Sequence, residues 1–195
     1  MRPTRLALSA LLLTLSAVGC SLLEPREALT PRWFRPALPS VAPGAPAQDA
    51  PRLRLRPVSS AHHLGERIAW RVGDVEYGKH ELLRWMEAPA DVIERGLTEA
   101  LFVSGRARRS KSASAAVLSV TVLRFEEQRQ PEHRVEVELL ATLHDPDGQA
   151  LLSRRFSSGA PLTDDDPSAL AREIGAVAGH QIDELVNAVV AALNR

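Results

Sequence analysis

Cys20 is the only cysteine of the 195-residue chain, and a thiolate is a strong nucleophile. The residues before it follow a defined order: two arginines among the first five residues, an almost wholly apolar stretch at 6–15, and small residues at 17–19. A basic start, a short apolar run and a small-residue cleavage site are typical of a signal peptide. The apolar run is too short to span a bilayer. We therefore predict that residues 1–19 are a signal peptide and no part of the fold.

The run Ala-Val-Gly-Cys resembles the lipobox of bacterial lipoproteins. This resemblance implies that the thiol of Cys20 takes a diacylglycerol, that the preceding peptide is removed, and that the new amino terminus is acylated. A free thiol is the alternative, and the position of the cysteine favours lipidation. Two or more acyl chains hold a protein on a membrane essentially permanently, since each buried methylene contributes ~0.8 kcal/mol. Because Ser21 rather than aspartate follows, the lipoprotein sorting rule indicates the periplasmic face of the outer membrane, with the inner membrane as the alternative.

Other residues that could act in catalysis or metal binding lack partners at a recognisable spacing. Glu87 has no accompanying base, nucleophile or metal ligand, so we expect no catalytic role. His62 and His63 are adjacent, and neighbours on a strand point to opposite faces, which disfavours one shared metal ion. The acidic run 164–166 lacks the glycine and terminal glutamate of a calcium loop, and a helix start explains it. We expect no enzyme activity, no metal, and no cofactor besides the covalent lipid.

Four basic residues gather among serines after a predicted helix: Arg106, Arg108, Arg109 and Lys111. One interpretation is a solvated loop. The other is a basic patch that contacts an acidic partner or anionic lipid headgroups. The chain as a whole has 24 basic and 24 acidic residues, so its net charge does not favour nucleic acid.

Proline sets the character of the segment after Cys20. Eight of the 14 prolines lie between residues 25 and 57, mixed with alanine, glycine and serine. This composition predicts a semi-rigid tether over residues 20–51. Two adjacent aromatic residues, Trp33 and Phe34, are costly to leave in a solvated tether, so we expect a short docking strand at 32–38.

The folded domain is predicted to cover residues 52–195. Residues 134–143 alternate strictly, which places Leu139 on an apolar face and Glu138 on the opposite, exposed face. The run 145–148, Asp-Pro-Asp-Gly, has strong turn chemistry and predicts a hairpin. Further strands are expected at 52–57, 67–72, 75–83, 116–127 and 150–156, and helices at about 89–104 and 167–194. Sheet followed by helix, twice, indicates an α+β two-layer sandwich in which a mainly antiparallel sheet is packed by two helices.

One stretch resembles a known family. The residues Arg84, Trp85, Glu87 and Pro89 stand at the spacing of the Arg-Trp-Ala-Glu-x-Pro signature of the ABC-type transport auxiliary lipoproteins, the PqiC-like family. Met86 replaces the usual alanine. The stretch 63–71 is similar to the family's strand before the signature, and Trp33-Phe34 stands in the place of an early Tyr-Tyr pair. The resemblance implies a periplasmic accessory of a lipid transporter, whose partners are an MCE-domain protein and the ABC permease and ATPase.

The role of the signature has two interpretations. In the structural one, Trp85 closes the core while Arg84 and Glu87 satisfy backbone groups near the helix start. In the other, the signature contacts a partner. For the whole protein the rivals of an adaptor are a periplasmic carrier of lipid or another small ligand, and an envelope-assembly or structural lipoprotein. The sequence leaves open whether the protein forms a homo-oligomer.

Overall fold

The computed structural model describes residues 29–195, and Pro31–Arg195 form one compact unit. The predicted signal peptide, Cys20 and Ser21 lie outside the described residues, so lipidation remains a prediction. The compact unit starts at Pro31, earlier than the predicted domain start at residue 52. The reason is that the proline-rich residues from 31 onward pack against the domain.

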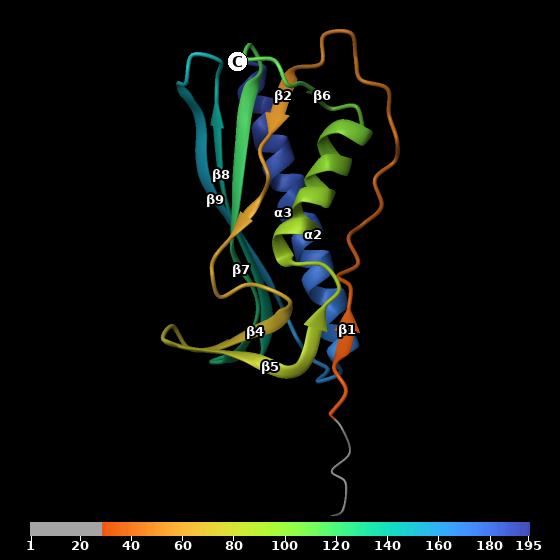
Figure 1. The fold of residues 1–195 in the computed structure, drawn as a ribbon, viewed down its shortest axis with the longest axis vertical. Coiled ribbons are helices and arrows are strands. Elements are labelled where there is room, and N and C mark those ends of the chain that lie inside the picture. Colours follow the sequence, from red (N-terminus) through yellow and green to blue (C-terminus); the bar gives the residue numbers. More distant parts are fainter. Residues whose placement is uncertain (1–28) are drawn as a thin grey trace, which may run out of the picture. The chain divides into compact units, whose positions relative to one another are not determined.

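The sheet is built around β7 (Ala116–Gln130), and within the described residues it has nine strands (Figure 1). One edge of β7 pairs antiparallel with β8 (Arg134–His144), which pairs antiparallel with β9 (Ala150–Pro161). The other edge of β7 pairs in parallel with three short strands in succession: β2 (Arg52–Leu55), β3 (Ser59–Ser60) and β4 (Arg67–Val72).

Three more strands extend this second edge. Strand β5 (Glu76–Trp85) runs antiparallel to β4, β1 (Arg32–Phe34) runs parallel to β5, and β6 (Arg108–Arg109) runs parallel to β2. The sheet is therefore mixed, although its longest pairings, β7–β8 and β8–β9, are antiparallel as expected. Within the range 32–38, where a short docking strand is predicted, the structure has a strand at Arg32–Phe34 and irregular chain after it.

Two helices cover one face of the sheet, as Figure 1 shows. Helix α2 (Pro89–Thr98) begins with proline in its first turn and continues into a short π-helix, η2 (Glu99–Val103). Helix α3 (Pro167–Leu193) likewise begins with proline, after the extended residue Asp166 at its N-cap, and packs against β8 and β9. Proline suits the first turn because the missing N–H has no partner there. The predicted α+β architecture is confirmed.

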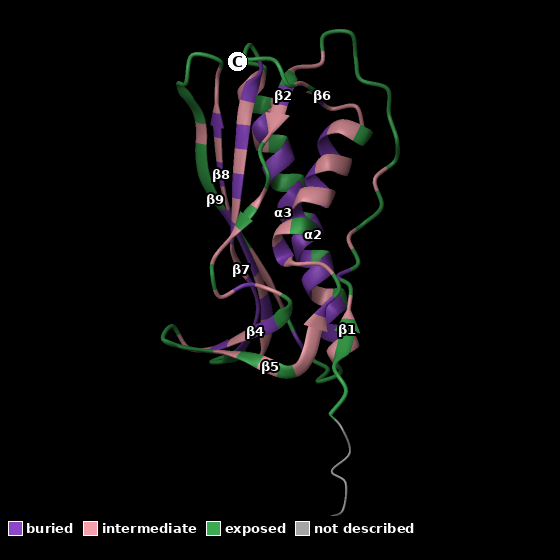
Figure 2. Ribbon diagram, viewed as in Figure 1, coloured by how far each residue is buried: buried purple, intermediate pink, exposed green. Residues whose placement is uncertain are grey.

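The core lies between the sheet and the helices, where Figure 2 shows the buried residues concentrated. Leu139 of β8, Leu185 of α3 and Leu97 of α2 are fully buried. Trp85 and Phe125 are the largest fully buried side chains, and their rings meet edge to face with centroids 5.6 Å apart. Aromatic side chains of this size contribute a large share of the stability of a small core.

A β-bulge divides β7 into two halves. Val122 pairs with Leu139 but Arg124 pairs with Glu138, so Leu123 is an extra residue in β7. An extra residue reverses which side chains face the core. Before the bulge the even-numbered positions are inward, and after it Phe125 is inward while Glu126 turns to the face away from the helices.

Residues 35–51 form a strap that passes over α2 and α3. Pro36 is buried, and Leu38 packs against the core. A side chain at Gly175 of α3 would stand 2.6 Å from the backbone of Ala37, and one at Gly179 would stand 2.3 Å from Pro39. These helical glycines therefore admit the strap backbone at close range. Of the semi-rigid tether predicted over residues 20–51, the part from Pro31 onward belongs to the compact unit.

Candidate interaction surfaces and buried charge clusters

The signature residues lie at the end of β5 and the start of α2. Trp85 is 1% exposed and contacts Phe125, which is the core-closing role expected of it. The guanidinium of Arg84 donates to the backbone carbonyls of His80 and Leu83, both at 3.2 Å. Arg84 thus satisfies backbone groups of its own strand rather than those of the helix start.

Glu87 does not cap α2, whose N-cap residue, Ala88, has no side-chain hydrogen bond. The carboxylate of Glu87 instead accepts a hydrogen bond from Arg95 Nε at 3.1 Å and lies 3.4 Å from Arg35 Nε. Arg95 belongs to α2 and Arg35 to the strap. Glu87 therefore links the strap to the helix. Its role is structural, as expected, but its partners are two arginine side chains and not backbone groups at the helix start.

The basic cluster predicted at 106–111 is only partly a free surface. Arg106 donates to the side chain of Asn187 on α3, and Arg108 donates to the carbonyl of Ala47 in the strap at 2.9 Å. Arg109 is exposed, donates to Thr98 at 3.1 Å, and lies over the ring of Phe102. Lys111 is exposed. The structure thus divides the cluster into two anchoring arginines, 106 and 108, and two exposed cations, 109 and 111.

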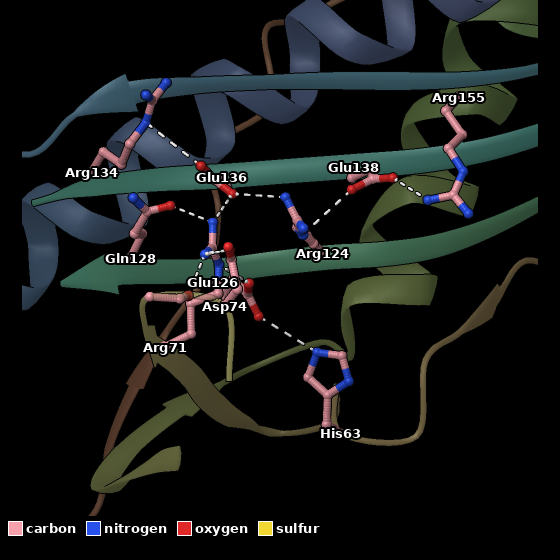
Figure 3. A network of polar contacts seen from close by, with 11 residues as sticks. His63, Arg71, Asp74, Arg124, Glu126, Gln128, Arg134, Glu136, Glu138 and Arg155 are labelled. Atoms are coloured by element: carbon pink, nitrogen blue, oxygen red, sulfur yellow. Dashed lines mark hydrogen bonds and ion pairs between the residues drawn. The ribbon is translucent and has the colours of Figure 1, made fainter. Parts of the chain in front are cut away.

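A charge cluster that sequence reasoning missed lies on the face of the sheet away from the helices (Figure 3). Glu126 is fully buried, Arg71 is 4% exposed, and Arg71 Nε lies 2.9 Å from Glu126 Oε1. This contact is electrostatic, since its geometry is not that of an aligned hydrogen bond. Arg71 also donates to Glu136, to Gln128 and to the carbonyl of Gly73. One guanidinium therefore holds groups from β7, β8 and the β4–β5 turn.

The pKa values of both charged groups at the centre of this cluster are raised, but for different reasons. Burial raises the pKa of Glu126, and the nearby charges of Arg71 and His63 oppose this only in part. Burial alone would lower the pKa of Arg71, but the hydrogen bond and charge of Glu136, with the charge of Glu126, raise it. Arg71 thus stays charged, while Glu126 resists ionisation more than an exposed glutamate does.

Glu138, expected to be exposed, is 7% exposed. Arg124 of β7 lies 3.4 Å from its carboxylate, and Arg155 of β9 donates to it at 2.8 Å. The alternation in β8 predicted the correct face for Glu138. The expectation of full solvation is wrong, because long arginine side chains from both neighbouring strands cover this face.

A second buried cluster surrounds Glu127 on the helix side of the sheet. Each oxygen of Glu127 lies 2.7 Å from one imidazole Nε2, that of His80 on β5 and that of His133 after β7. Arg129 Nε donates to Glu127 at 3.3 Å. These groups line a hollow of about 220 Å³ whose other walls are Leu83, Leu162, Asp165, Pro167 and Leu170.

This environment stabilises the charged form of Glu127. Burial alone would raise its pKa, but the hydrogen bonds from His80 and His133 and the charge of Arg129 lower it to about 2. The pKa values of Glu126 and Glu127, which are adjacent on β7, are thus shifted in opposite directions. The sequence signal that could have found both clusters is the Glu126-Glu127 pair itself, because two adjacent acidic residues on a strand point to opposite faces and at least one of them must face the core side of the sheet.

The histidines and acidic residues considered for metal binding are not brought together. His63 lies 3.5 Å from Glu126 and packs against the ring of Tyr77. Asp164 accepts a hydrogen bond from the backbone of Asp166, just before α3. Across residues 29–195, no group of three or more His, Cys, Asp or Glu side chains is arranged to hold a metal ion. Over the same residues, no helix is both long and apolar enough to cross a membrane.

Comparisons with solved structures show a shared fold. Protein XCC0632 from Xanthomonas campestris superposes with a TM-score of 0.70 at 22% sequence identity, over 83% of this chain and 96% of that one. Protein CT253 from Chlamydia trachomatis superposes with a TM-score of 0.56 at 11% identity, over 73% of this chain and 97% of that one. No protein of curated function matches the sequence.

A family model extends the likeness from fold to family. The model described as the ABC-type transport auxiliary lipoprotein component matches residues 35–186. That range runs from the strap through the signature and strands β2–β9 into α3. The chain therefore belongs to the family of ABC-type transport auxiliary lipoprotein components.

Proposed function

We propose that this protein is a non-catalytic accessory of an MCE-type ABC lipid transport system, anchored through a lipid on Cys20 to the periplasmic face of the outer membrane. The family match over residues 35–186 carries the proposal of a transport accessory. The lipobox-like run before Cys20 and Ser21 supports the anchor and its membrane. The MCE partner is proposed from the resemblance of residues 84–89 to the family signature.

The packing of the core supports an adaptor over a lipid carrier. A carrier needs an apolar cavity that encloses most of its ligand. Between the sheet and the helices, that space is filled by Trp85, Phe125, Phe156 and Leu139, each at most 1% exposed. A hollow of about 240 Å³ lies beneath the strap, but Glu99 and Asp183 belong to its lining. These acidic residues suit an acyl chain poorly.

The surface proposed for the transport partner is the exposed part of the basic cluster, Arg109 and Lys111. Both are exposed, and β6, which carries Arg109, lies near the same end of the unit as the C-terminus (Figure 1). Exposed arginine and lysine attract an acidic partner at long range and are screened by salt. The contact is therefore proposed to be an electrostatic one.

The anchor is tested at Cys20. The full chain is expressed in its own host, and the mass of the mature protein is measured with the membrane fraction that retains it. We expect a triacylated mature chain in the outer membrane, and an uncleaved, unacylated precursor from Cys20→Ser. Normal processing and retention of the Cys20→Ser protein would overturn the anchor, and a lipidated protein in the inner membrane would overturn its placement.

The partner surface is tested by capture of the co-encoded MCE protein. A double reversal, Arg109→Glu with Lys111→Glu, is expected to weaken capture at low salt, and moderate salt should weaken capture by the parent. The matched control is Arg32→Glu with Arg67→Glu, which makes the same charge change on other exposed residues. Equal, salt-insensitive capture by all three proteins would exclude this surface. Absence of capture, with lipid co-purifying instead, would favour a carrier.

A further inference from the structure

Trp33 lies in a row of side chains that crosses three strands. In the strand register, Trp33 of β1 pairs with Arg84 of β5, and Arg84 pairs with Arg67 of β4. Directly paired residues on neighbouring strands point to the same face of a sheet. Trp85 and Phe34, the next pair along, point to the opposite face and into the core. The row of Trp33, Arg84 and Arg67 therefore faces away from the helices.

The row contains an aromatic ring, that of Trp33, which is exposed to water and is not part of the core. Trp33 is 51% exposed, whereas Trp85 is 1% exposed. Met86 is 54% exposed and is held beside β1 by its backbone N–H, which donates to the carbonyl of Phe34 at 2.8 Å. Two large apolar side chains thus stand at the end of the sheet formed by β1 and β5. A tryptophan ring and a flexible thioether are both suited to contact with another phase or molecule.

Basic residues surround the two apolar side chains. Arg67 is exposed on the face of Trp33, Arg32 is exposed but lies over the ring of Phe34 on the opposite face, and the side chain of Arg35 is 63% exposed although it contacts Glu87. Exposed acidic residues lie nearby as well: Glu66 precedes β4, Glu81 belongs to β5, and Asp165 lines a hollow with Leu83 of β5. Tryptophan is enriched at membrane interfaces, where its amphipathic ring lies at headgroup level. Arginine beside it is attracted to anionic headgroups.

The position of the row along the chain selects the membrane as its partner. Trp33 lies at the start of the compact unit, which begins at Pro31, and it follows Cys20 by only 13 residues. Even a fully extended chain of that length spans at most ~45 Å. A lipid on Cys20 would therefore keep Trp33 within reach of the bilayer at all times. A separate protein partner has no comparable tie to this end of the sheet.

We propose that the row of Trp33, Arg84 and Arg67, with Met86, docks onto an anionic bilayer surface and places the Trp33 ring among the lipid headgroups. The proposal rests on the lipid anchor proposed above. The anchor alone would leave the domain free to tumble above the membrane. The docking surface fixes its orientation, with β1 and β5 against the bilayer and the end that carries β6 and the C-terminus away from it (Figure 1).

The test uses tryptophan fluorescence in vesicles that contain brominated lipids, which quench only rings in or near the bilayer. The lipidated full chain, with its acylation first confirmed by mass, is reconstituted into phosphatidylethanolamine vesicles with phosphatidylglycerol. We expect quenching in the parent, and loss of most of it in Trp33→Phe, because Trp85 is buried and Trp70 is partly covered by Arg129.

Charge variants separate docking from incidental proximity. Arg67→Glu should reduce the quenching, while Arg52→Glu, the same charge change at an exposed residue of β2 beside β6, should leave it unchanged. Undiminished quenching in Trp33→Phe, or none in an acylated parent, overturns the proposal. Protection of Trp33 only when the MCE protein is added would assign the row to a protein partner and likewise overturn it. A protein that carries no acyl chain refutes the anchor instead, which the mass measurement shows separately.

Discussion

Glu126 of β7 lies directly opposite Glu136 of β8, and the guanidinium of Arg71 stands between the two carboxylates. Like charges in direct cross-strand register repel each other. Because Glu126 is fully buried, this repulsion is not screened by water, and Arg71 must compensate for it from β4. The cluster therefore joins the parallel half of the sheet to the β7–β8 hairpin.

Removal of Arg71 should be among the most damaging changes outside the core. Arg71→Ala leaves two facing carboxylates without their shared cation, and loss of one partner of a buried ion pair costs about 3–5 kcal/mol. Urea unfolding at neutral pH measures this loss. The matched control is Arg155→Ala, whose side chain is 67% exposed and pairs with Glu138. That change should cost under about 1 kcal/mol. Equal losses of stability in the two variants would mean that the buried position of Arg71 adds nothing to its contribution.

Glu127 should make the protein sensitive to acid. Its pKa is lowered from 4.5 to about 2, so its contribution is fully present above pH 4.5 and is lost as pH falls through 2. A shift of this size corresponds to about 3 kcal/mol. Glu127→Gln should lose that stability at neutral pH and flatten the pH dependence between 4.5 and 2. An unchanged pH profile, from urea unfolding at a series of pH values, would contradict the assignment.

The stability contribution of Glu126 should depend on pH in the opposite direction to that of Glu127. Its pKa is raised by burial, so its contribution is fully present below the ordinary pKa of a glutamate and is lost as pH rises through the raised pKa. Glu126→Gln keeps the shape of the side chain and removes this titration. The stability of the variant should therefore fall less than that of the parent as pH rises from 4.5 to 7. The same urea series checks the result, and a steeper fall in the variant would refute it.

Gly175 provides a test of the strap in which the expected sign is unusual. Glycine to alanine inside a helix normally stabilises by about 1 kcal/mol. At Gly175, however, a Cβ would lie 2.6 Å from the backbone of Ala37, so Gly175→Ala should lower the melting temperature and speed elastase cleavage of the strap after Ala37. Gly65→Ala, where a Cβ meets nothing within 4 Å, is the control. A stabilised Gly175→Ala protein would show that the strap is not closely packed.

The two faces of β8 should respond differently from what alternation alone predicts. Leu139→Ala should cost about 2–5 kcal/mol, because it leaves a cavity in a fully buried site. Glu138→Ala, first expected to be nearly neutral, should cost measurably more than Arg155→Ala because it leaves Arg124 without one of its carboxylates. Chemical unfolding of the three variants gives the order. If Glu138→Ala does not change stability, the face that carries Glu138 behaves as a solvated one, as alternation alone predicts.

Local patterns predicted the elements of this fold better than their pairing. The alternation around Leu139 and the proline at each helix start are local signals, and both led to correct elements. The bulge at Leu123 has no such signal, and it alone decides that Glu126 turns away from the helices while Phe125 enters the core. The strap was missed because proline-rich composition describes an isolated chain, whereas its packing depends on helical glycines more than a hundred residues away.

The parallel pairing of β1 with β5 determines how a force on the N-terminus enters the domain. A pull on the chain before Arg32 acts along the axis of β1, so the bonds to β5 are loaded together in shear rather than opened one after another. The next residues of the chain are clamped against α3 where Ala37 meets Gly175. Drag on a surface-tethered molecule would thus be resisted first by the β1–β5 ladder and then by this clamp, and β7 at the centre of the sheet would remain unloaded.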